Sequence, residues 1–325
     1  MSQLVISALG DPARTAALVK DPDLTLRPGD LLVAMEAAPI NPVDSLYANG
    51  WYPIQPVLPA VLGSEGVGRV VEAGNDTDAT LVGKRVVVIN PYRQGVWGDR
   101  VVVPAANVVE VPEGADGHQL SMLSINPLTA HLLLNDYATL QPGDWVAQDL
   151  GNSGVGRSVI ALARRAGVRT LNIVRRPEVA AELRDLGADE VLVDGPGLAE
   201  RITEKPGLAF DGAGGPVAET LAAALAPGGT LVSYSAIATG ESPRLPLGPL
   251  VFGGLTHRGL WISNWLAATP RAEIERVYAE LAALVADGTL HVPVEATYPL
   301  DQYERALDHA ARPGRSGKIL FTFES

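Results

Sequence analysis

A run of glycines and small polar residues lies where an expected strand passes into an expected helix. The run reads Gly151-Asn152-Ser153-Gly154-Val155-Gly156. Backbone N–H groups at such a turn, together with the N-terminus of the following helix, would face a bound pyrophosphate. The spacing G-x-x-G-x-G differs from the usual G-x-G-x-x-G, so a tight turn without a ligand is the alternative when the motif is taken alone.

Two arginines, Arg175 and Arg176, end the next expected strand, about 20 residues further on, where NAD enzymes usually carry an acid for the ribose 2′-hydroxyl. A guanidinium can hold a 2′-phosphate through two hydrogen bonds, whereas an acid would repel it. The pair therefore predicts NADPH as the cofactor. Two solvated arginines at the surface are the alternative.

The elements that position these residues follow a βαβ pattern, because apolar runs alternate with helical stretches from about residue 140. Six strands of this kind complete a Rossmann sheet, which is doubly wound and parallel, so the fold class is α/β. The expected strands are 145–150, 170–174, 190–193, 208–211, 230–234 and 255–260, and the helices between them are 155–166, 179–186 and 217–225.

The preceding part of the chain, from Asp30 to about Pro112, contains short β-rich runs separated by Gly and Pro, which indicates a compact barrel-like domain. After Trp265 come a long helical pattern, a shorter one and a terminal strand, and we expect this tail to return to the first domain. The predicted domains are 1–124 with 266–325, rich in β-structure, and 125–265, the Rossmann domain. The runs are 31–34, 66–72, 85–89 and 100–103, and the tail elements are 270–287, 301–311 and 318–323.

Composition narrows the classes of function. The 325 residues are 47% hydrophobic and fit two domains with full cores. Lys and Arg number 25 against 37 Asp and Glu, a net charge of −12 that would repel nucleic acid. Without cysteine there is no disulfide, no thiolate nucleophile and no Cys-based zinc site.

The N-terminal residues, Met1 to Arg14, lack the features of a secretory signal or an organelle transit peptide. No apolar run reaches the length needed to span a membrane. We therefore predict a cytoplasmic protein with no membrane partner.

Several landmarks resemble the medium-chain dehydrogenase/reductase superfamily and, within it, the trans-2-enoyl-thioester reductases of mitochondrial fatty-acid synthesis and their bacterial relatives. The similarity covers nearly the whole chain, and it implies a GroES-like catalytic domain beside the Rossmann domain. The run Gly259-Leu260-Trp261-Ile262-Ser263-Asn264-Trp265 is the most discriminating. The others are Ile40-Asn41-Pro42-Val43-Asp44, Gly50-Trp51-Tyr52, Leu58-Pro59-Ala60-Val61, Gly66-Val67, Asn126-Pro127-Leu128-Thr129-Ala130, Leu140-Gln141-Pro142-Gly143-Asp144 and Asn152-Ser153-Gly154-Val155-Gly156.

Catalytic zinc is not expected. Zinc-dependent members of the superfamily carry Gly-His-Glu where this chain has Gly63-Ser64-Glu65, and they carry cysteine ligands. The five histidines lack the spacing of metal ligands, so none is assigned to a metal. They are His118, His131, His257, His291 and His309.

The resemblance implies reduction of a carbon–carbon double bond conjugated to a thioester, with hydride passing to the β-carbon and negative charge developing on the thioester oxygen. That charge needs a hydrogen-bond donor, and the α-carbon needs a proton. Tyr52 aligns with the family's catalytic tyrosine. A tyrosine packed in a turn is the alternative reading of Tyr52, and Tyr47 is its competitor for the donor role. Asn41, Tyr47 and Trp265 are the expected substrate contacts.

The resemblance also assigns cofactor contacts. The family has Tyr-Gly-Gly-Met where this chain has Tyr234-Ser235-Ala236-Ile237, which puts the contacts of that segment in doubt. The contacts are Asn126 at the nicotinamide half, Asn152, Ser153, Gly154, Val155 and Gly156 at the pyrophosphate, Arg175 and Arg176 at the 2′-phosphate, Tyr234, Ser235, Ala236 and Ile237 at the sheet edge, Leu260, Trp261 and Ile262 at the nicotinamide amide, and Lys318 near the cofactor.

Trp261 and Trp265 fit either a substrate wall or a packed core or interface. The apolar strand that ends at Trp261 is expected near a sheet edge, where it invites pairing with a second copy. Together with the family's habit, this predicts a homodimer. Two other functions remain open, an NADPH:quinone oxidoreductase and a catalytically silent NADPH-binding structural or interaction protein.

Overall fold

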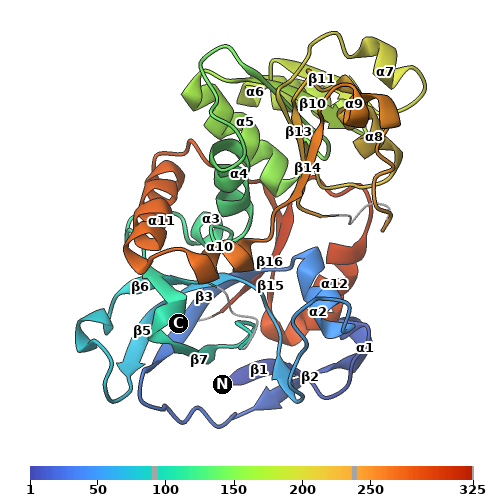
Figure 1. Cartoon of the computed structure of the whole chain (residues 1–325). Coiled ribbons are helices and arrows are strands. Elements are labelled where there is room, and N and C mark those ends of the chain that lie inside the picture. Colours follow the sequence, from blue (N-terminus) through green and yellow to red (C-terminus); the bar gives the residue numbers. More distant parts are fainter. Residues whose placement is uncertain (90–93, 236–239, 324–325) are drawn as a thin grey trace. The chain divides into compact units, whose positions relative to one another are not determined.

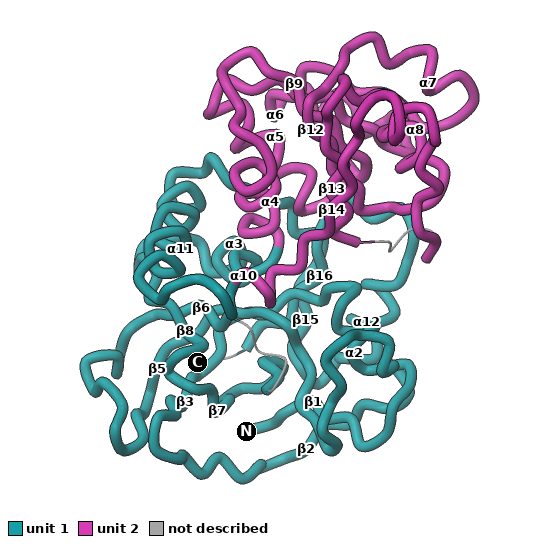
Figure 2. The backbone as a smooth tube through the Cα atoms, in the orientation of Figure 1, with its two compact units in different colours: residues 1–125, 266–325 teal, residues 126–265 magenta. Residues whose placement is uncertain are grey.

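The computed structural model describes residues 1–89, 94–235 and 240–323. The chain forms two compact units, one made of residues 1–125 and 266–325 and the other of residues 126–265 (Figures 1 and 2). The C-terminal tail thus belongs to the first unit, because its last strand pairs there with a strand near the N-terminus.

The second unit contains a six-stranded parallel sheet in the order β11-β10-β9-β12-β13-β14. This is the doubly wound Rossmann order, and its direction reverses between β9 and β12, which makes that point the topological switch point. The predicted α/β fold with a Rossmann sheet is confirmed. The strands are β9 (Trp145–Gln148), β10 (Arg169–Val174), β11 (Glu190–Val193), β12 (Leu208–Asp211), β13 (Thr230–Ser233) and β14 (Thr256–Gly259).

Helices cover the Rossmann sheet, and buried side chains alternate between its two faces with the period of a strand. Ala209 and Leu231 pack in one apolar layer, whereas Phe210 and Val232 pack in the other. The helices of this unit are α4 (Asn126–Asn135), α5 (Gly154–Ala166), the 3-10 turn Pro177–Val179, α6 (Ala180–Leu186), α7 (Leu198–Arg201), α8 (Pro216–Ala224) and α9 (Leu247–Val251).

The first unit is rich in β-structure. Its main sheet has the order β15-β16-β3-β5-β6-β8, with β7 paired to β3, and a small sheet has the order β2-β1-β4. Its core contains Val33, Trp97 and Phe321. The strands are β1 (Ser2–Ile6), β2 (Ala16–Lys20), β3 (Asp30–Pro39), β4 (Ala60–Val61), β5 (Gly66–Ala73), β6 (Arg85–Val88), β7 (Arg100–Pro104), β8 (Val108–Glu110), β15 (Val294–Pro299) and β16 (Lys318–Thr322).

The first unit also carries several helices, of which the longest is α11 (Arg271–Ala286). The others are α1 (Pro12–Thr15), α2 (Pro42–Ala48), α3 (Gly117–Ser121), α12 (Tyr303–Ala311) and the 3-10 turns Ala79–Leu81, Ala105–Asn107 and Leu300–Gln302. One helix, α10 (Ile262–Ala268), contains the boundary between the units. Within the described ranges, the chain has no helix that combines the length and the apolar character required to cross a bilayer.

Candidate functional site

The glycine run forms the turn between β9 and α5. Ser153 caps the helix, because its Oγ accepts a hydrogen bond from the Gly156 backbone N at 3.0 Å. A Cβ on Gly156 would lie 2.5 Å from the Leu150 carbonyl oxygen, and one on Gly154 would lie 2.9 Å from Asn126 Cγ. The turn is therefore so close-packed that only glycine fits at both positions, and it lies at the helix N-terminus, where phosphate groups bind.

Two polar groups near this turn are buried without a hydrogen-bond partner among the described residues, namely Asn126 Nδ2 and the Tyr234 hydroxyl. The Tyr234 hydroxyl lies beside Ser153. Burial, then the carboxyl groups of Asp149 and Asp211, raise the pKa of Tyr234, so its hydroxyl keeps its proton. Because an unsatisfied buried donor is costly, both groups fit a site that a polar ligand completes, and a dinucleotide is such a ligand.

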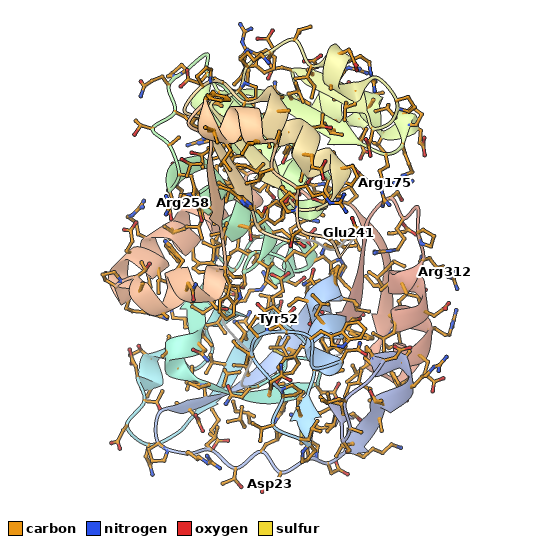
Figure 3. The ribbon with its side chains drawn as sticks, turned by 45° about the vertical axis from the view of Figure 1, so that its right-hand side comes forward. Asp23, Tyr52, Arg175, Glu241, Arg258 and Arg312 are labelled. Carbon is orange, nitrogen blue, oxygen red and sulfur yellow. The ribbon has the colours of Figure 1, made fainter. Side chains whose placement is uncertain are left out.

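The two arginines follow β10 at the carboxyl edge of the same sheet. Arg175 is exposed (Figure 3). Arg176 is half-buried, and its Nη1 lies 3.7 Å from Glu178 Oε1. The turn approaches β10 through a hydrogen bond from the Gly151 N to the Ile173 O, at 3.1 Å. The second unit thus presents the glycine turn and both arginines along one sheet edge.

The remaining expected cofactor residues of the second unit lie around β13 and β14. Tyr234 and Ser235 follow β13, whereas Ala236 and Ile237 lie outside the described residues. Leu260 N donates to Ser233 O at 3.0 Å. The expected strand to Leu260, continuing to Trp261, ends instead at Gly259, and α10 begins at Ile262. The predicted C-terminal end of this strand was wrong, because the run after Gly259 leads into helix α10.

In the first unit, strand register brings three polar residues together. Strand β16 runs antiparallel to β3 with Leu320 opposite Pro39, which places Lys318 next to Asn41. Lys318 Nζ donates to Asn41 Oδ1, and Asn41 Nδ2 donates to Glu65 Oε1 at 2.9 Å. The resemblance assigned Asn41 to the substrate and Lys318 to the cofactor, and the structure joins them by a hydrogen bond.

Two carboxyl groups with raised pKa values belong to this cluster. Burial raises the pKa of Asp44 to about 7 and that of Glu65 to about 7, although the charge of Lys318 opposes both changes. Asp44 Oδ2 accepts a hydrogen bond from Asn41 N at 2.7 Å, which caps α2. Burial lowers the pKa of Lys318. Burial thus shifts all three groups toward their neutral forms.

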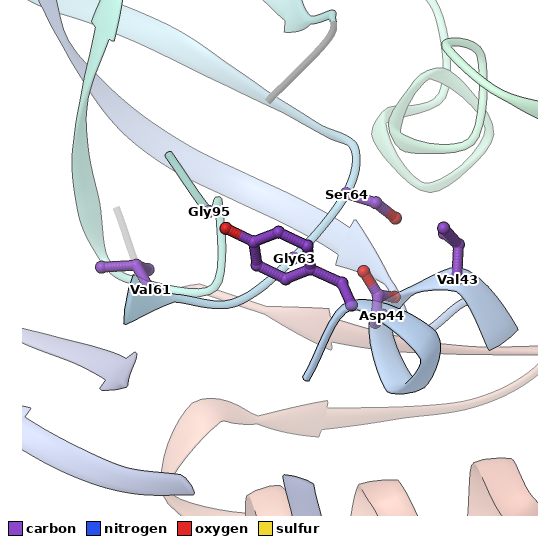
Figure 4. A pocket seen from close by; sticks show the side chains of 7 residues that line it. Val43, Asp44, Val61, Gly63, Ser64 and Gly95 are labelled. Atoms are coloured by element: carbon purple, nitrogen blue, oxygen red, sulfur yellow. The ribbon is translucent and has the colours of Figure 1, made fainter. Parts of the chain in front are cut away.

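A small pocket with about 220 Å³ of empty space, partly open to solvent, adjoins this cluster. Figure 4 shows Asp44 and Val43 on α2 and Ser64 on the segment that precedes β5. The lining residues are Val43, Asp44, Tyr47, Val61, Gly63, Ser64 and Gly95. The pocket combines apolar walls with a carboxyl and two hydroxyl groups.

The two candidate tyrosines have different surroundings. Tyr47 lies on α2, where it is buried with 9% of its surface exposed, and burial raises its pKa. Tyr52 lies in the loop after α2, half-buried against the core of the first unit (Figure 3). Its neighbour Trp51 is 75% exposed. The loop therefore holds Tyr52 within reach of a solute, while Tyr47 faces the small pocket.

Sequence reasoning missed the four buried acids, Asp44, Glu65, Asp149 and Asp211. Asp44 and Glu65 occur in motifs that were noted for other reasons, and Asp211 ends an expected strand. The sequence feature that could have identified these buried acids is a charged residue inside an apolar segment. Trp265, the third expected substrate contact, lies half-buried in α10, in the second unit, whereas Asn41 and Tyr47 belong to the first.

Among the residues that the structure describes, no three acidic or histidine side chains gather as metal ligands do. His309, for example, bonds through Nδ1 to the Tyr298 hydroxyl and through Nε2 to Glu295 Oε1. Both ring nitrogens of His309 are thus engaged by protein groups.

Known proteins show the same two-part organisation. The model of the alcohol dehydrogenase GroES-like domain matches residues 27–113, and that of the zinc-binding dehydrogenase matches residues 154–286. A structure assigned as an NADPH:quinone reductase from Bacillus thuringiensis has a TM-score of 0.91 at 25% identity, covering 99% of each chain. The Etr1p/NADP/crotonyl-CoA complex has a TM-score of 0.85 at 21% identity, again covering 99% of each chain.

The GroES-like unit and the doubly wound sheet with its glycine turn define a medium-chain dehydrogenase/reductase, a superfamily that uses nicotinamide cofactors. The mitochondrial enoyl-(acyl-carrier-protein) reductase of Rattus norvegicus is 36% identical over 98% of this chain and 88% of its own length. Within the superfamily, the chain therefore belongs to the family of enoyl-(acyl-carrier-protein) reductases.

Proposed function

We propose that this chain reduces the C2=C3 double bond of 2-enoyl thioesters with NADPH. The observation that carries the proposal is the 36% identity with a rat enoyl-(acyl-carrier-protein) reductase over 98% of the chain. One feature of each unit supports the proposal. The second unit offers a turn that can hold a dinucleotide, and the first offers Tyr52 in a position that a solute can reach.

A bound nicotinamide supplies the hydride that adds to the β-carbon of the substrate. Negative charge then develops on the thioester oxygen, and a hydrogen-bond donor placed at that oxygen lowers the barrier. We assign this role to the Tyr52 hydroxyl. The α-carbon takes its proton from Tyr52 or from solvent. The acyl group is bound as a thioester to CoA or to a carrier protein.

The cradle assigns the parts of the dinucleotide to residues of the second unit. The pyrophosphate is held at residues 152–156, and Asn126 Nδ2 and the Tyr234 hydroxyl, which have no hydrogen bond of normal geometry within the described part of the chain, offer donors. Arg175 and Arg176 meet the 2′-phosphate, which only NADPH carries. NADPH is therefore the proposed cofactor in preference to NADH.

A quinone is the second candidate substrate, because the NADPH:quinone reductase structure from Bacillus thuringiensis has a TM-score of 0.91 to this chain. Neither reaction requires a zinc ligand set. The two candidates differ in the electrophile, which is an enoyl thioester in one and a quinone in the other.

Absorbance of NADPH distinguishes these functions. We expect NADPH to be consumed with crotonyl-CoA, more slowly with a simple quinone, and much more slowly when NADH replaces NADPH. Turnover of the quinone alone would replace the enoyl reductase with the quinone reductase. Tight NADPH binding without turnover of crotonyl-CoA or the quinone would indicate the catalytically silent alternative. Equal rates with NADH and NADPH would show that Arg175 and Arg176 do not recognise the 2′-phosphate.

We also propose a homodimer that pairs through β14. This strand lies at the end of the Rossmann sheet, and all four of its residues are exposed. An unpaired strand edge offers free N–H and C=O groups to a second copy. The cytoplasm stays the predicted compartment, whereas the rat relative is named as mitochondrial.

A further inference from the structure

Two buried aspartates lie at the switch point of the Rossmann sheet. Asp149 follows β9 and is 1% exposed, and Asp211 ends β12 and is 0% exposed. The two strands are neighbours, with the Asp149 N bonded to the Phe210 O at 3.2 Å. Their carboxyl groups accept hydrogen bonds from the same short segment, at the Gly212 N and the Gly214 N, which holds the two groups near each other. Two buried carboxylates at such close range cannot both be ionised, so the pair must retain a proton.

The hydrogen bonds show which aspartate suits a proton. Asp211 Oδ1 accepts from the Gly214 N at 2.8 Å, and its Oδ2 accepts from Ser233 Oγ at 2.7 Å. Asp149 Oδ1 accepts from the Gly212 N at 2.8 Å, and the Ala213 backbone N–H also favours the charged carboxyl, but no hydrogen bond of normal geometry reaches the buried Asp149 Oδ2 among the described residues. Asp149 Oδ2 is therefore the oxygen of the pair that best fits a proton.

The groups around the pair add no positive charge next to Asp149. A Cβ on Gly212 would lie 2.5 Å from the Tyr234 hydroxyl, so that neutral phenol lies against the Gly212 backbone, whose N–H donates to Asp149. On the other side, Ser233 Oγ lies 2.9 Å from His257 Nε2 on β14. Since Ser233 gives its only hydrogen to Asp211, His257 Nε2 donates to Ser233.

The electrostatics agree with this assignment. Burial, followed by the charge of Asp211, raises the pKa of Asp149 well above its ordinary value. No ion pair joins either aspartate to a described Lys or Arg. The proton on Asp149 is thus the main means by which this part of the sheet avoids a second negative charge.

The pair lies where a dinucleotide would bind. Ligands of doubly wound sheets bind at the carboxyl ends of the strands beside the switch point, and Asp149 directly precedes Leu150 and the glycine turn. Tyr234 lies against Gly212, which is next to Asp211 in the chain, and its hydroxyl is near Ser153. A second carboxylate charge here would repel the phosphates of an anionic ligand, because repulsion between charges is strong in a poorly solvated site.

We propose that Asp149 is a positioning residue of the cofactor site, whose proton allows the anionic dinucleotide to bind at the switch point. This inference rests on the proposed NADPH site. It predicts that NADPH affinity falls as Asp149 loses its proton at alkaline pH. An amide at this position, which is neutral at every pH, removes that dependence.

Fluorescence titration of the cofactor-free protein with NADPH tests the proposal. As Asp149 loses its proton at alkaline pH, we expect the wild-type dissociation constant to rise about tenfold, because a buried charge then appears near the phosphates. Asp149→Asn should bind within about threefold of wild type at pH 7 and show a flat profile, since it replaces one neutral group with another. Asp185→Asn, an exposed acid on α6, should follow the wild-type curve.

Infrared spectroscopy supplies a readout that does not depend on the cofactor. Wild type should show the C=O band of one protonated carboxylic acid in addition to the bands of Asp44 and Glu65, whose pKa values are about 7. It should be absent from Asp149→Asn and present in Asp185→Asn. If Asp149→Asn does not fold, the wild-type band must still disappear over the pH interval in which NADPH affinity falls.

Several results would overturn the proposal. The first is a wild-type NADPH affinity that does not change with pH. The second is an Asp149→Asn variant whose affinity follows the wild-type pH profile, or differs from that of wild type by well over threefold at pH 7. The third is the absence of the carboxylic acid band from wild type. Absence of NADPH binding at every pH would instead remove the proposed function, so the two failures are distinguishable.

Discussion

Tyr47 and Tyr52 lie on one short segment, but their surroundings suit them to different tasks. Tyr47 is buried in α2 and lines the small pocket with Asp44, whereas Tyr52 is half-buried in the loop that follows. A donor to a developing enolate must reach the substrate oxygen, which favours the residue in the loop. The buried tyrosine suits a packing role beside the acidic cluster.

Replacing Tyr52 with phenylalanine therefore tests the donor role directly. The change removes one hydroxyl and keeps the ring that packs against the core. Loss of one donor to a developing oxyanion lowers kcat by about 10²- to 10³-fold, and we expect a loss of this size with crotonyl-CoA. NADPH affinity, measured by fluorescence, should stay within a few-fold of wild type.

Tyr47→Phe is the matched control for that variant, since it removes the same group five residues earlier. We expect it to retain most of the wild-type kcat. If Tyr47→Phe loses turnover and Tyr52→Phe does not, the donor is Tyr47. If neither variant loses turnover, solvent supplies the hydrogen bond.

At the scale of elements, the β9 turn depends on close approach of two backbone segments. A methyl group on Gly156 would lie 2.5 Å from the Leu150 O and 2.6 Å from the Gly151 O, and neither backbone oxygen can move without opening the turn. We expect Gly156→Ala to lower the free energy of unfolding by about 1–3 kcal/mol and to weaken NADPH binding. Urea unfolding and fluorescence titration measure the two effects.

Gly207→Ala serves as its control, because a Cβ there has no atom within 4 Å and the residue lies in the same unit. It should leave both measurements near wild type. Equal NADPH affinity in Gly156→Ala and wild type would show that the turn does not hold the dinucleotide.

The elements that the sequence predicted well are those with a clear period. The helix α5 and the five parallel strands β9 to β13 have apolar residues at regular spacing, and glycine or polar residues mark their ends. Helix α4 was missed because it is buried on nearly every side and has no polar face, and α7 because it spans only four residues. The periodicity argument has nothing to detect in either case.

The candidate site was predictable only where its residues form one continuous motif. The glycine turn and Arg175 are motifs of this kind. By contrast, Lys318 meets Asn41 across 277 positions of sequence, through the register of β16 on β3. Asp149 meets Asp211 because β9 and β12 are neighbours in the sheet order, which no local pattern contains.

At the scale of the whole molecule, the chain has a net charge of −12. The proposed function nevertheless requires it to bind an anionic cofactor. Its overall field disfavours that ligand, so local features must attract it. The helix N-terminus at Ser153 and the side chains of Arg175 and Arg176 provide positive potential. The proton on Asp149 removes one opposing charge, which accounts for a buried acid at a phosphate-binding edge.

The proposed homodimer is a whole-molecule property with a local test. On β14, the Thr256 N bonds inward to the Gly229 O and the Leu260 N bonds inward to the Ser233 O. The alternation of a strand therefore turns the His257 N outward, toward the edge where a second copy would pair. Proline at 257 removes this outward donor and leaves the inward bonds in place.

We expect His257→Pro to lower the mass measured by light scattering from that of a dimer to that of the 34.1 kDa chain, with an unchanged circular dichroism spectrum. His257→Ala retains the backbone N–H and should remain dimeric, which separates the loss of the donor from the loss of the side chain. A dimeric His257→Pro would move the interface elsewhere, for instance to the exposed apolar residues Leu247 and Phe252 at α9. A wild-type protein that is monomeric at micromolar concentration would contradict the proposed homodimer.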